Sequence, residues 1–440
     1  MEQTILRPTA EQRYADELAA LRRWDVGNPK PENWRLSPRA VRLFLLGTGR
    51  GQTLEVDGEH ISIRKKYYGN DALVERCIIT LAGNRGLMLV GEPGTAKTML
   101  SELLSAAISG HSTNTVQGTA GTTEDMIKYS WNYALLLAKG PSREALVPSP
   151  LYVGMERGIL TRFEEITRTP AEVQDCLISV LSDKVMNIPE LGDEGILFAR
   201  PGFNVIGTAN TRDKGVNEMS SALKRRFSFE TVQPVGDVAL EKRIILDEAG
   251  AMAQSAGISV PLDEDAATLL ATAYHELRQG ISAEGMRLKK PAAVMSTAEA
   301  VSVYYQTLMS AWYYGGPEQA RHLDERALAE NLMGAVAKES REELAAVREY
   351  FTAIVQKKAE REGGAWKRFY EAGIRLVRTG ALFPGAPPLP RLCLASGARD
   401  PPIPARVDPD RGAGECQQPD SHSGLPRHRG PGGTVLLLSG

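Results

Sequence analysis

A glycine-rich loop that ends in Lys-Thr is the segment whose residue types point most directly to chemistry. It follows an apolar strand-like stretch at residues 87–90 and leads into a helical pattern. Its backbone amides can turn inward around an anion, the helix start adds partial positive charge, and a lysine can reach terminal phosphates. We therefore predict an ATP-binding loop made of Gly91, Glu92, Pro93, Gly94, Thr95, Ala96, Lys97 and Thr98.

Two positions in this loop carry further expectations. The Thr98 hydroxyl is placed to contact Mg2+ in a loop of this type. Ala96 stands directly before the lysine, where the usual pattern has glycine. We expect Ala96 to enter the helix at negative φ, where one methyl group is tolerated.

Two adjacent acids end a second strand-like segment about 65 residues further on. In a nucleotide site, one carboxylate positions the Mg2+ shell and another polarises the attacking water. We assign Glu164 to the metal side and Glu165 to the catalytic base. The first acid is usually aspartate, and the extra methylene of Glu164 moves its carboxylate by about a bond length. Thr161 and Arg162 are unusual in a central strand, and a solvated acidic pair before a helix is the alternative.

A third apolar strand, residues 203–210, is followed by a segment that closes on Lys-Arg-Arg-Phe. The order of these motifs resembles the AAA+ superfamily of ATPases. By this resemblance Asn210 is expected to act as sensor 1 on the water or terminal phosphate. Arg226 is expected to be the arginine finger that reaches a neighbouring subunit, with Arg225 as second candidate, because a guanidinium presents fixed donors to phosphate oxygens. A basic helix end that offsets its own dipole is the alternative.

Within AAA+, three stretches resemble the MoxR-like ATPases: GEPGTAKT at 91–98, the acidic pair with its following helix at 164–184, and an insert at 184–203. The insert is predicted to be a hairpin with strand-like arms around Gly192 to Gly195. The resemblance implies a homo-oligomeric ring, six subunits by family habit, with inserts at the pore face. It also implies a von Willebrand factor A domain protein as partner and a protein client for a chaperone or metal-insertion activity.

One departure from the family concerns the lid. Members often carry a sensor 2 arginine in a Ser-Pro-Arg segment, whereas this chain has Ser296, Thr297 and Ala298. Arg287, Lys289 and Lys290 lie just upstream. They either substitute for that arginine or form a solvated surface run, and the sequence leaves both interpretations open.

The elements that must position these residues indicate an α/β fold. We expect a P-loop AAA+ core with a parallel sheet covered by helices on both faces, followed by an all-helical lid. The tail has arginine but no lysine, and it is expected to be disordered, either as a native linker or as a frameshift product. The predicted divisions are an N-terminal, mostly helical extension (1–71), the nucleotide-binding core (72–235), the lid (236–315), additional C-terminal helices (316–378) and a Pro/Gly/Arg-rich tail (379–440).

Composition narrows the classes of function. The chain has 440 residues, 52 basic and 54 acidic, with a formal charge of -2, which gives no bulk attraction to nucleic acid or an anionic membrane. No apolar run approaches the roughly 20 residues of a spanning helix, and no signal peptide pattern is present. Four scattered cysteines lack metal-ligand spacing. We expect a cytoplasmic protein whose cofactors are ATP and Mg2+.

Three functions remain in competition. The leading hypothesis is a Mg2+-dependent ATPase that remodels or assembles a protein partner. A nucleotide-gated scaffold with weak or no hydrolysis is the alternative, motivated by Glu164, Arg162 and the missing lid arginine. A nucleic-acid-stimulated motor is disfavoured by the charge, and the basic run at residues 64–66 is expected to be a solvated strand end.

Overall fold

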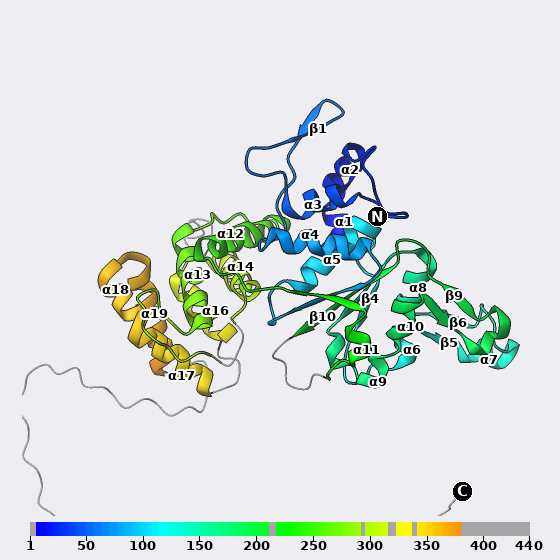
Figure 1. Ribbon diagram of the computed structural model, residues 1–440. Coiled ribbons are helices and arrows are strands. Elements are labelled where there is room, and N and C mark those ends of the chain that lie inside the picture. The colour runs from blue at the N-terminus through cyan, green and yellow to red at the C-terminus, as the bar shows by residue number, and fades with distance from the viewer. Residues whose placement is uncertain (1–5, 211–216, 292–294, 316–322, 337–340, 380–440) are drawn as a thin grey trace, which may run out of the picture. The chain divides into compact units, whose positions relative to one another are not determined.

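The computed structural model describes residues 6–210, 217–291, 295–315, 323–336 and 341–379 (Figure 1). From residue 380 onward the predicted Pro/Gly/Arg-rich tail lies outside the described residues, and so does the segment 211–216 between Asn210, the predicted sensor 1, and the arginine candidates.

A five-stranded sheet forms the centre of the core, with strand order β11-β3-β10-β7-β4. Every neighbouring pair in it runs parallel. Parallel strands need crossover connections, and helices supply them here. The strands are β3 (Gly86–Gly91), β4 (Thr115–Gln117), β7 (Leu160–Glu164), β10 (Asn204–Asn210) and β11 (Phe227–Thr231).

Helices cover both faces of this sheet, as the apolar strands predicted. Side chains alternate along a strand, and in β3 Leu87 and Leu89 pack with α4 and α5 while Met88 packs on the opposite face with α8 and α10. The expected fold class is therefore confirmed. The helices of the core are α4 (Asp71–Ala82), α5 (Lys97–Ser109), α6 (Glu124–Ile127), α8 (Pro150–Arg157), η1 (Ile166–Arg168), α9 (Ala171–Gln174), α10 (Leu177–Ser182) and α11 (Ser221–Lys224).

The N-terminal segment adds helices to one of these faces. Its buried residues, such as Leu21 and Phe44, belong to the same hydrophobic cluster as those of α5 (Figure 1). Its elements are α1 (Ala10–Arg13), α2 (Ala15–Trp24), α3 (Pro38–Leu46) and an antiparallel hairpin of β1 (Leu54–Val56) and β2 (Glu59–Ile61).

The basic run that follows this hairpin is engaged by acids of the same chain. Arg64 pairs with Glu248, and Lys65 pairs with Asp71. Lys66 is buried, donates to Glu17 and lies over the rings of two aromatic residues. The expected solvated run is therefore wrong for Lys66, because its ammonium is enclosed by N-terminal helices that the local pattern did not place there.

Two inserts project from the core and contact each other. The predicted hairpin is confirmed, with β8 (Val185–Asn187) and β9 (Ile196–Phe198) as arms and η2 (Pro189–Glu194) between them. A second insert of β5 (Tyr129–Trp131), α7 (Tyr133–Lys139) and β6 (Leu146–Pro148) was not predicted. Glu190 joins the two inserts, accepting from the Tyr129 hydroxyl at 2.9 Å and the Trp131 indole at 3.4 Å.

The lid is all-helical, as expected, and it shares one hydrophobic cluster with the helices after it. Asp237, Asp263 and Ser296 cap the starts of its three helices through side-chain hydrogen bonds. These helices are α12 (Val238–Ser255), α13 (Glu264–Gln279) and α14 (Thr297–Tyr314), followed by α16 (Glu325–Val336), α17 (Arg341–Tyr350), the π-helix η3 (Phe351–Val355), α18 (Gln356–Glu362) and α19 (Gly364–Thr379).

Candidate nucleotide site

The glycine-rich loop connects the end of β3 to the start of α5, as predicted. Two of its residues have left-handed backbone: Gly94 at φ 74° and Ala96 at φ 66°. The expectation of negative φ at Ala96 is therefore wrong. Ala96 is the N-cap residue, where the chain must reverse its curvature before the helix begins. A left-handed L-residue costs about 1–2 kcal/mol, which explains why glycine is usual at this position.

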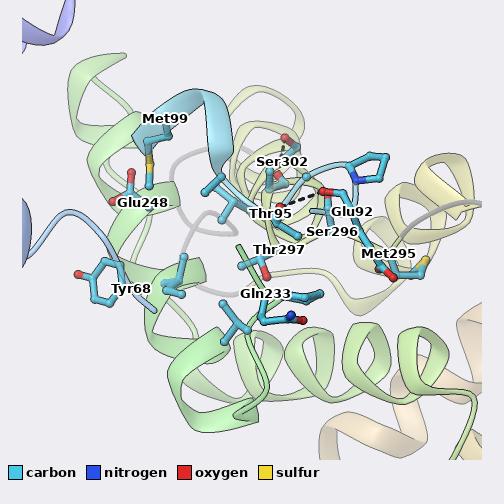
Figure 2. A pocket seen from close by; sticks show the side chains of 18 of the residues that line it. Tyr68, Glu92, Thr95, Met99, Gln233, Glu248, Met295, Ser296, Thr297 and Ser302 are labelled. Carbon is cyan, nitrogen blue, oxygen red and sulfur yellow. Dashed lines mark hydrogen bonds between the residues drawn. The ribbon is translucent and has the colours of Figure 1, made fainter. Parts of the chain in front are cut away.

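Lys97 lies inside the loop and is 6% exposed. Its ammonium donates to the carbonyls of Gly91 at 3.1 Å and Glu92 at 2.7 Å. The Thr95 hydroxyl also donates to the Glu92 carbonyl, at 2.9 Å (Figure 2). The loop thus holds the lysine at the end of β3, where a phosphate group that enters the loop can take over these contacts.

Glu164 ends β7 and is buried, and four side chains donate to its carboxylate. Thr98 and Thr208 donate to Oε2 at 2.9 and 2.7 Å, and Ser101 donates to Oε1 at 2.7 Å. Arg162 forms an ion pair with Oε1 at 2.8 Å. Burial alone raises the pKa of Glu164, but Arg162 and these hydroxyl donors outweigh burial and hold the pKa below its ordinary value.

The donor set around Glu164 fits a divalent cation of the hard type. Mg2+ takes oxygen ligands, and the Thr98 hydroxyl and a Glu164 carboxylate oxygen lie 2.9 Å apart at the end of the loop. Thr208, on β10, was missed by sequence reasoning. Its only sequence signal is that it stands two residues before Asn210 on the same strand, so that both side chains lie on one face.

Glu165 follows Glu164 in a left-handed conformation, at φ 53°. Its amide donates to the Thr208 hydroxyl at 3.0 Å, and its carboxylate pairs with Arg168 at 3.0 Å. Its side chain is about a third exposed, at 35%, in contrast to the buried Glu164. Adjacent acids therefore have different environments, one enclosed and one reachable by water.

Asn210 stands at the end of β10, in register with Gly91 of the loop. Since β3, β7 and β10 are parallel neighbours, their carboxyl ends meet at one edge of the sheet. The loop, the two acids and the predicted sensor are thus brought together within one chain.

The arginine candidates lie at the opposite edge of the same sheet. The Arg226 carbonyl accepts from the amide of Gly86, the first residue of β3, whereas the loop begins at its last residue. Six residues of strand separate these ends by about 16 Å. Arg226 itself bonds to the Ser182 hydroxyl and to the Ala222 carbonyl, and Arg225 is exposed. Neither is brought to the site of its own chain.

A cavity of about 310 Å³ adjoins the loop and is shared by the core and the lid. Figure 2 shows Glu92 and Thr95 of the loop facing lid residues, with Met99, Tyr68 and Gln233 also lining the space. Apolar side chains among its lining residues suit the base and ribose of a nucleotide. These apolar residues include Met99, Val235, Ile244, Met252, Met295 and Val301.

The lid touches the loop directly. A Cβ built on Gly94 would lie 2.0 Å from Cβ of Ser296, the N-cap of α14. No side chain fits between these two segments without movement. Ser296, the residue compared above with the start of a Ser-Pro-Arg segment, thus closes on the loop through its backbone and a small side chain.

The lid arginine that lines the cavity is Arg278, which sequence reasoning missed. It donates to the Met295 carbonyl at 2.6 Å and to the Val235 carbonyl at 3.0 Å, and it pairs with the buried Glu241. The upstream candidates at 287, 289 and 290 are exposed and do not line this cavity. Arg278 lies in the last turn of α13, where a basic residue is common because it offsets the helix dipole, so the sequence did not single it out as a cavity residue.

Comparisons with known proteins place this geometry in a family. The family model described as AAA domain (dynein-related subfamily) matches residues 86–227, and that of the YehL-like AAA+ ATPase C-terminal domain matches 239–377. Uncharacterized protein YehL of Escherichia coli (strain K12) is 47% identical over 373 residues, which are 84% of this chain and 98% of that protein. An uncharacterized protein of Staphylococcus haemolyticus (strain JCSC1435) is 28% identical over 184 residues, or 40% of this chain and 66% of that protein.

Solved structures give a weaker likeness. NtrX from Brucella abortus in complex with ADP is 14% identical, with 71% of this chain and 64% of that chain covered and a TM-score of 0.42. A RuvB variant of Thermotoga maritima is 16% identical, with 71% and 89% covered and a TM-score of 0.38. The assignment therefore rests on the family models, on YehL and on the order of the sheet. The chain belongs to the family of YehL-like AAA+ ATPases.

Proposed function

We propose that this chain hydrolyses ATP with Mg2+ and that it works, as MoxR-like ATPases do, to remodel or assemble a protein partner. The observation that carries the proposal is the meeting of Lys97, Thr98, Glu164 and Thr208 at one edge of the sheet. AAA+ membership supports nucleotide binding at this place. Hydrolysis, the metal and the partner are the parts that experiments must test.

Each residue has a chemical task in this proposal. The loop amides and Lys97 hold the phosphates, with the lysine exchanging the carbonyls of Gly91 and Glu92 for phosphate oxygens. Thr98 and Glu164 would hold Mg2+, which when bound offsets charge on the transferred phosphate. Glu165 takes a proton from the attacking water, and Asn210 orients that water or the phosphate. The greater exposure of Glu165 suits a group that must meet water.

The position of Arg226, at the opposite edge of the sheet from its own loop, supports an assembly of several subunits. The backbone of Arg226 lies beside Gly86, about 16 Å along β3 from its own loop, and its guanidinium bonds to Ser182 and Ala222, so we infer that it serves a phosphate in a neighbouring copy. We therefore propose a homo-oligomeric ring, with six subunits by family habit, in which Arg226 or the exposed Arg225 completes the next site. A von Willebrand factor A domain protein and a protein client follow from the MoxR-like resemblance. Among the described residues, no helix is long and apolar enough to cross a membrane.

ATP hydrolysis measured against protein concentration tests the ring. Turnover per subunit is expected to rise with concentration and to fall at least tenfold in Lys97→Ala and in Arg226→Ala. A mixture of the two variants restores part of the activity, because mixed interfaces contain an intact site. Arg225→Ala tests the second candidate. The matched control is Arg326→Ala, which removes an exposed arginine that pairs with Glu330 on the same helix. Flat, concentration-independent turnover that survives Arg226→Ala and Arg225→Ala would refute shared sites.

A nucleotide-gated scaffold is the second candidate, and the saturated carboxylate of Glu164 favours it. An acid already held by Arg162 and three hydroxyls has fewer free lone pairs for a metal shell. ATP binding without hydrolysis in Mg2+ or Mn2+, at concentrations where rings form, would select this candidate. A nucleic-acid-stimulated motor would instead show a turnover that DNA or RNA raises.

A further inference from the structure

Arg162 is a charged residue in the middle of a fully buried strand, and the proposed mechanism does not use it. All five residues of β7 are buried, and Arg162 is paired in register with Ile206 on one side and Thr115 on the other. A buried guanidinium is costly unless acceptors surround it. The acceptors around it therefore indicate what this arginine does.

Its guanidinium spans the metal side of the site. Nε and Nη2 donate to Oε1 of Glu164 at 3.2 and 2.8 Å, and Nε also donates to the Ser101 hydroxyl at 3.0 Å. Nη1 donates to the carbonyl of Ser112 at 2.7 Å. Arg162 and Glu164 stand two residues apart on one strand, so that both side chains lie on the same face. The arginine is thus fixed at both ends of its planar fork.

The two carboxylate oxygens of Glu164 have different partners. Oε1 of Glu164 is held by Arg162 and Ser101, whereas Oε2 is the oxygen that contacts Thr98 and Thr208. Thr98 is the other residue placed on the Mg2+ side. Oε2 is therefore the oxygen that shares a contact with Thr98, whereas Arg162 contacts Oε1.

We propose that Arg162 is a positioning residue, matched to Glu164, which sets the oxygen that faces the metal. The pair replaces the usual shorter acid, and this inference rests on the proposed function. An aspartate at position 164 would withdraw its carboxylate by about 1.5 Å, the length of one carbon–carbon bond. It would lose Arg162, Thr98 or both. Removing Arg162 alone leaves a long, buried acid without its counter-charge.

A buried ion pair that only stabilises the core is the competing explanation. In that case, losing either partner lowers the free energy of unfolding but leaves the Mg2+ requirement unchanged. A positioning role changes the Mg2+ requirement in each single variant and restores it when both partners change together. A double-mutant cycle on Mg2+ dependence therefore separates the two explanations.

The experiment compares the full-length protein with Arg162→Met, Glu164→Asp and the double variant. A fluorescent ADP analogue is titrated in EDTA and across Mg2+ concentrations, and ATP turnover is measured beside it. We expect each single variant to need at least tenfold more Mg2+ for half-maximal effect. The double variant, with the shorter acid and no buried cation, should return to within about threefold of the parent. Arg326→Met, which removes an exposed arginine that pairs with Glu330 on the same helix, should leave the Mg2+ requirement and the turnover unchanged.

Additional arms keep the outcome decisive. If Arg162→Met fails to fold, Arg162→Lys retains the charge but loses the fork, and it should raise the Mg2+ requirement threefold to tenfold. An unchanged requirement in Arg162→Lys, or additive losses in the double variant, overturns the pair. If the parent binds the analogue with Mg2+ but never hydrolyses ATP, the proposed function fails while the binding cycle still judges the pair. If binding in the parent ignores Mg2+ but turnover requires it, the Mg2+ dependence of turnover judges the pair. Binding and turnover that both ignore Mg2+ in the parent overturn the pair and the proposed function.

Discussion

The contact between Gly94 and Ser296 makes a quantitative prediction about the lid. In Gly94→Ala, the new Cβ would meet Cβ of Ser296 at 2.0 Å and its hydroxyl oxygen at 2.5 Å. Carbon atoms pack at about 3.5–4.0 Å. The start of α14 must therefore retreat by about 1.5 Å or more. The left-handed backbone at φ 74° adds about 1–2 kcal/mol of strain that no movement of the lid relieves.

Ser296→Gly separates these two costs. It removes the clashing atoms, and glycine at an N-cap costs only a few tenths of a kcal/mol relative to serine. We expect Gly94→Ala to weaken nucleotide binding at least tenfold, about 1.4 kcal/mol. Adding Ser296→Gly should recover about 1 kcal/mol of that loss, while the backbone strain remains in the free energy of unfolding.

The assay is titration of a fluorescent nucleotide with the parent, both single variants and the double variant, beside urea denaturation of each. The control is Ser302→Ala, which removes the hydroxyl of another serine on the same helix and in the same cavity without placing glycine in a helix interior. If the loss of binding free energy in the double variant equals the sum of the losses in Gly94→Ala and Ser296→Gly within about 0.5 kcal/mol, direct contact between lid and loop is refuted.

Three further predictions concern other parts of the fold. Ala96→Gly should raise the free energy of unfolding by about 0.5–1 kcal/mol, since relief of left-handed strain exceeds the entropy gained by the unfolded chain; a loss in urea denaturation would contradict the backbone geometry. Lys358→Met should cost about 3–5 kcal/mol by leaving the buried Glu276 carboxylate without its cation at 3.0 Å, and Glu276→Gln added to it should recover part, as thermal melts would show. Burial raises the pKa of Glu284, but hydrogen bonds from Ser282 and Arg361 outweigh it and lower the pKa to about 2, so its contribution to stability is present above the unfolded pKa and lost as pH falls toward 2. Glu284→Gln should flatten that acid-side loss, and an unchanged pH profile of unfolding would count against the assignment.

Much of the site could be predicted because its signals are local. A loop between strand and helix, with Lys97 and Thr98 at its end, requires only neighbouring residues to be recognised. Alternating apolar residues in the strands similarly predicted a sheet covered on both faces. The same local reasoning places Glu164 and Glu165 at a strand end.

What sequence reasoning missed depends on contacts between distant segments. The φ of Ala96 is set by the turn that joins loop to helix, which propensity does not show. Arg162 is unusual in a strand by sequence alone, and its place there is explained only by the Ser112 carbonyl and the Glu164 carboxylate, which accept hydrogen bonds from its guanidinium. Arg278 is defined by carbonyls 17 and 43 residues away in sequence. The order of residues carries no signal for such partners.

We expect the lid and the C-terminal helices to respond to the nucleotide together. Ser296 starts α14 against the loop, and α14 packs in one cluster with α13 and with the helices that follow. Glu276 of α13 accepts from the Tyr350 hydroxyl at 2.7 Å and pairs with the buried Lys358, so that α13 is fastened to α17 and α18. A close-packed core transmits displacement instead of absorbing it. We therefore expect a phosphate that shifts Gly94 to move these helices together, so that the C-terminal helices take part in any motion that the nucleotide drives.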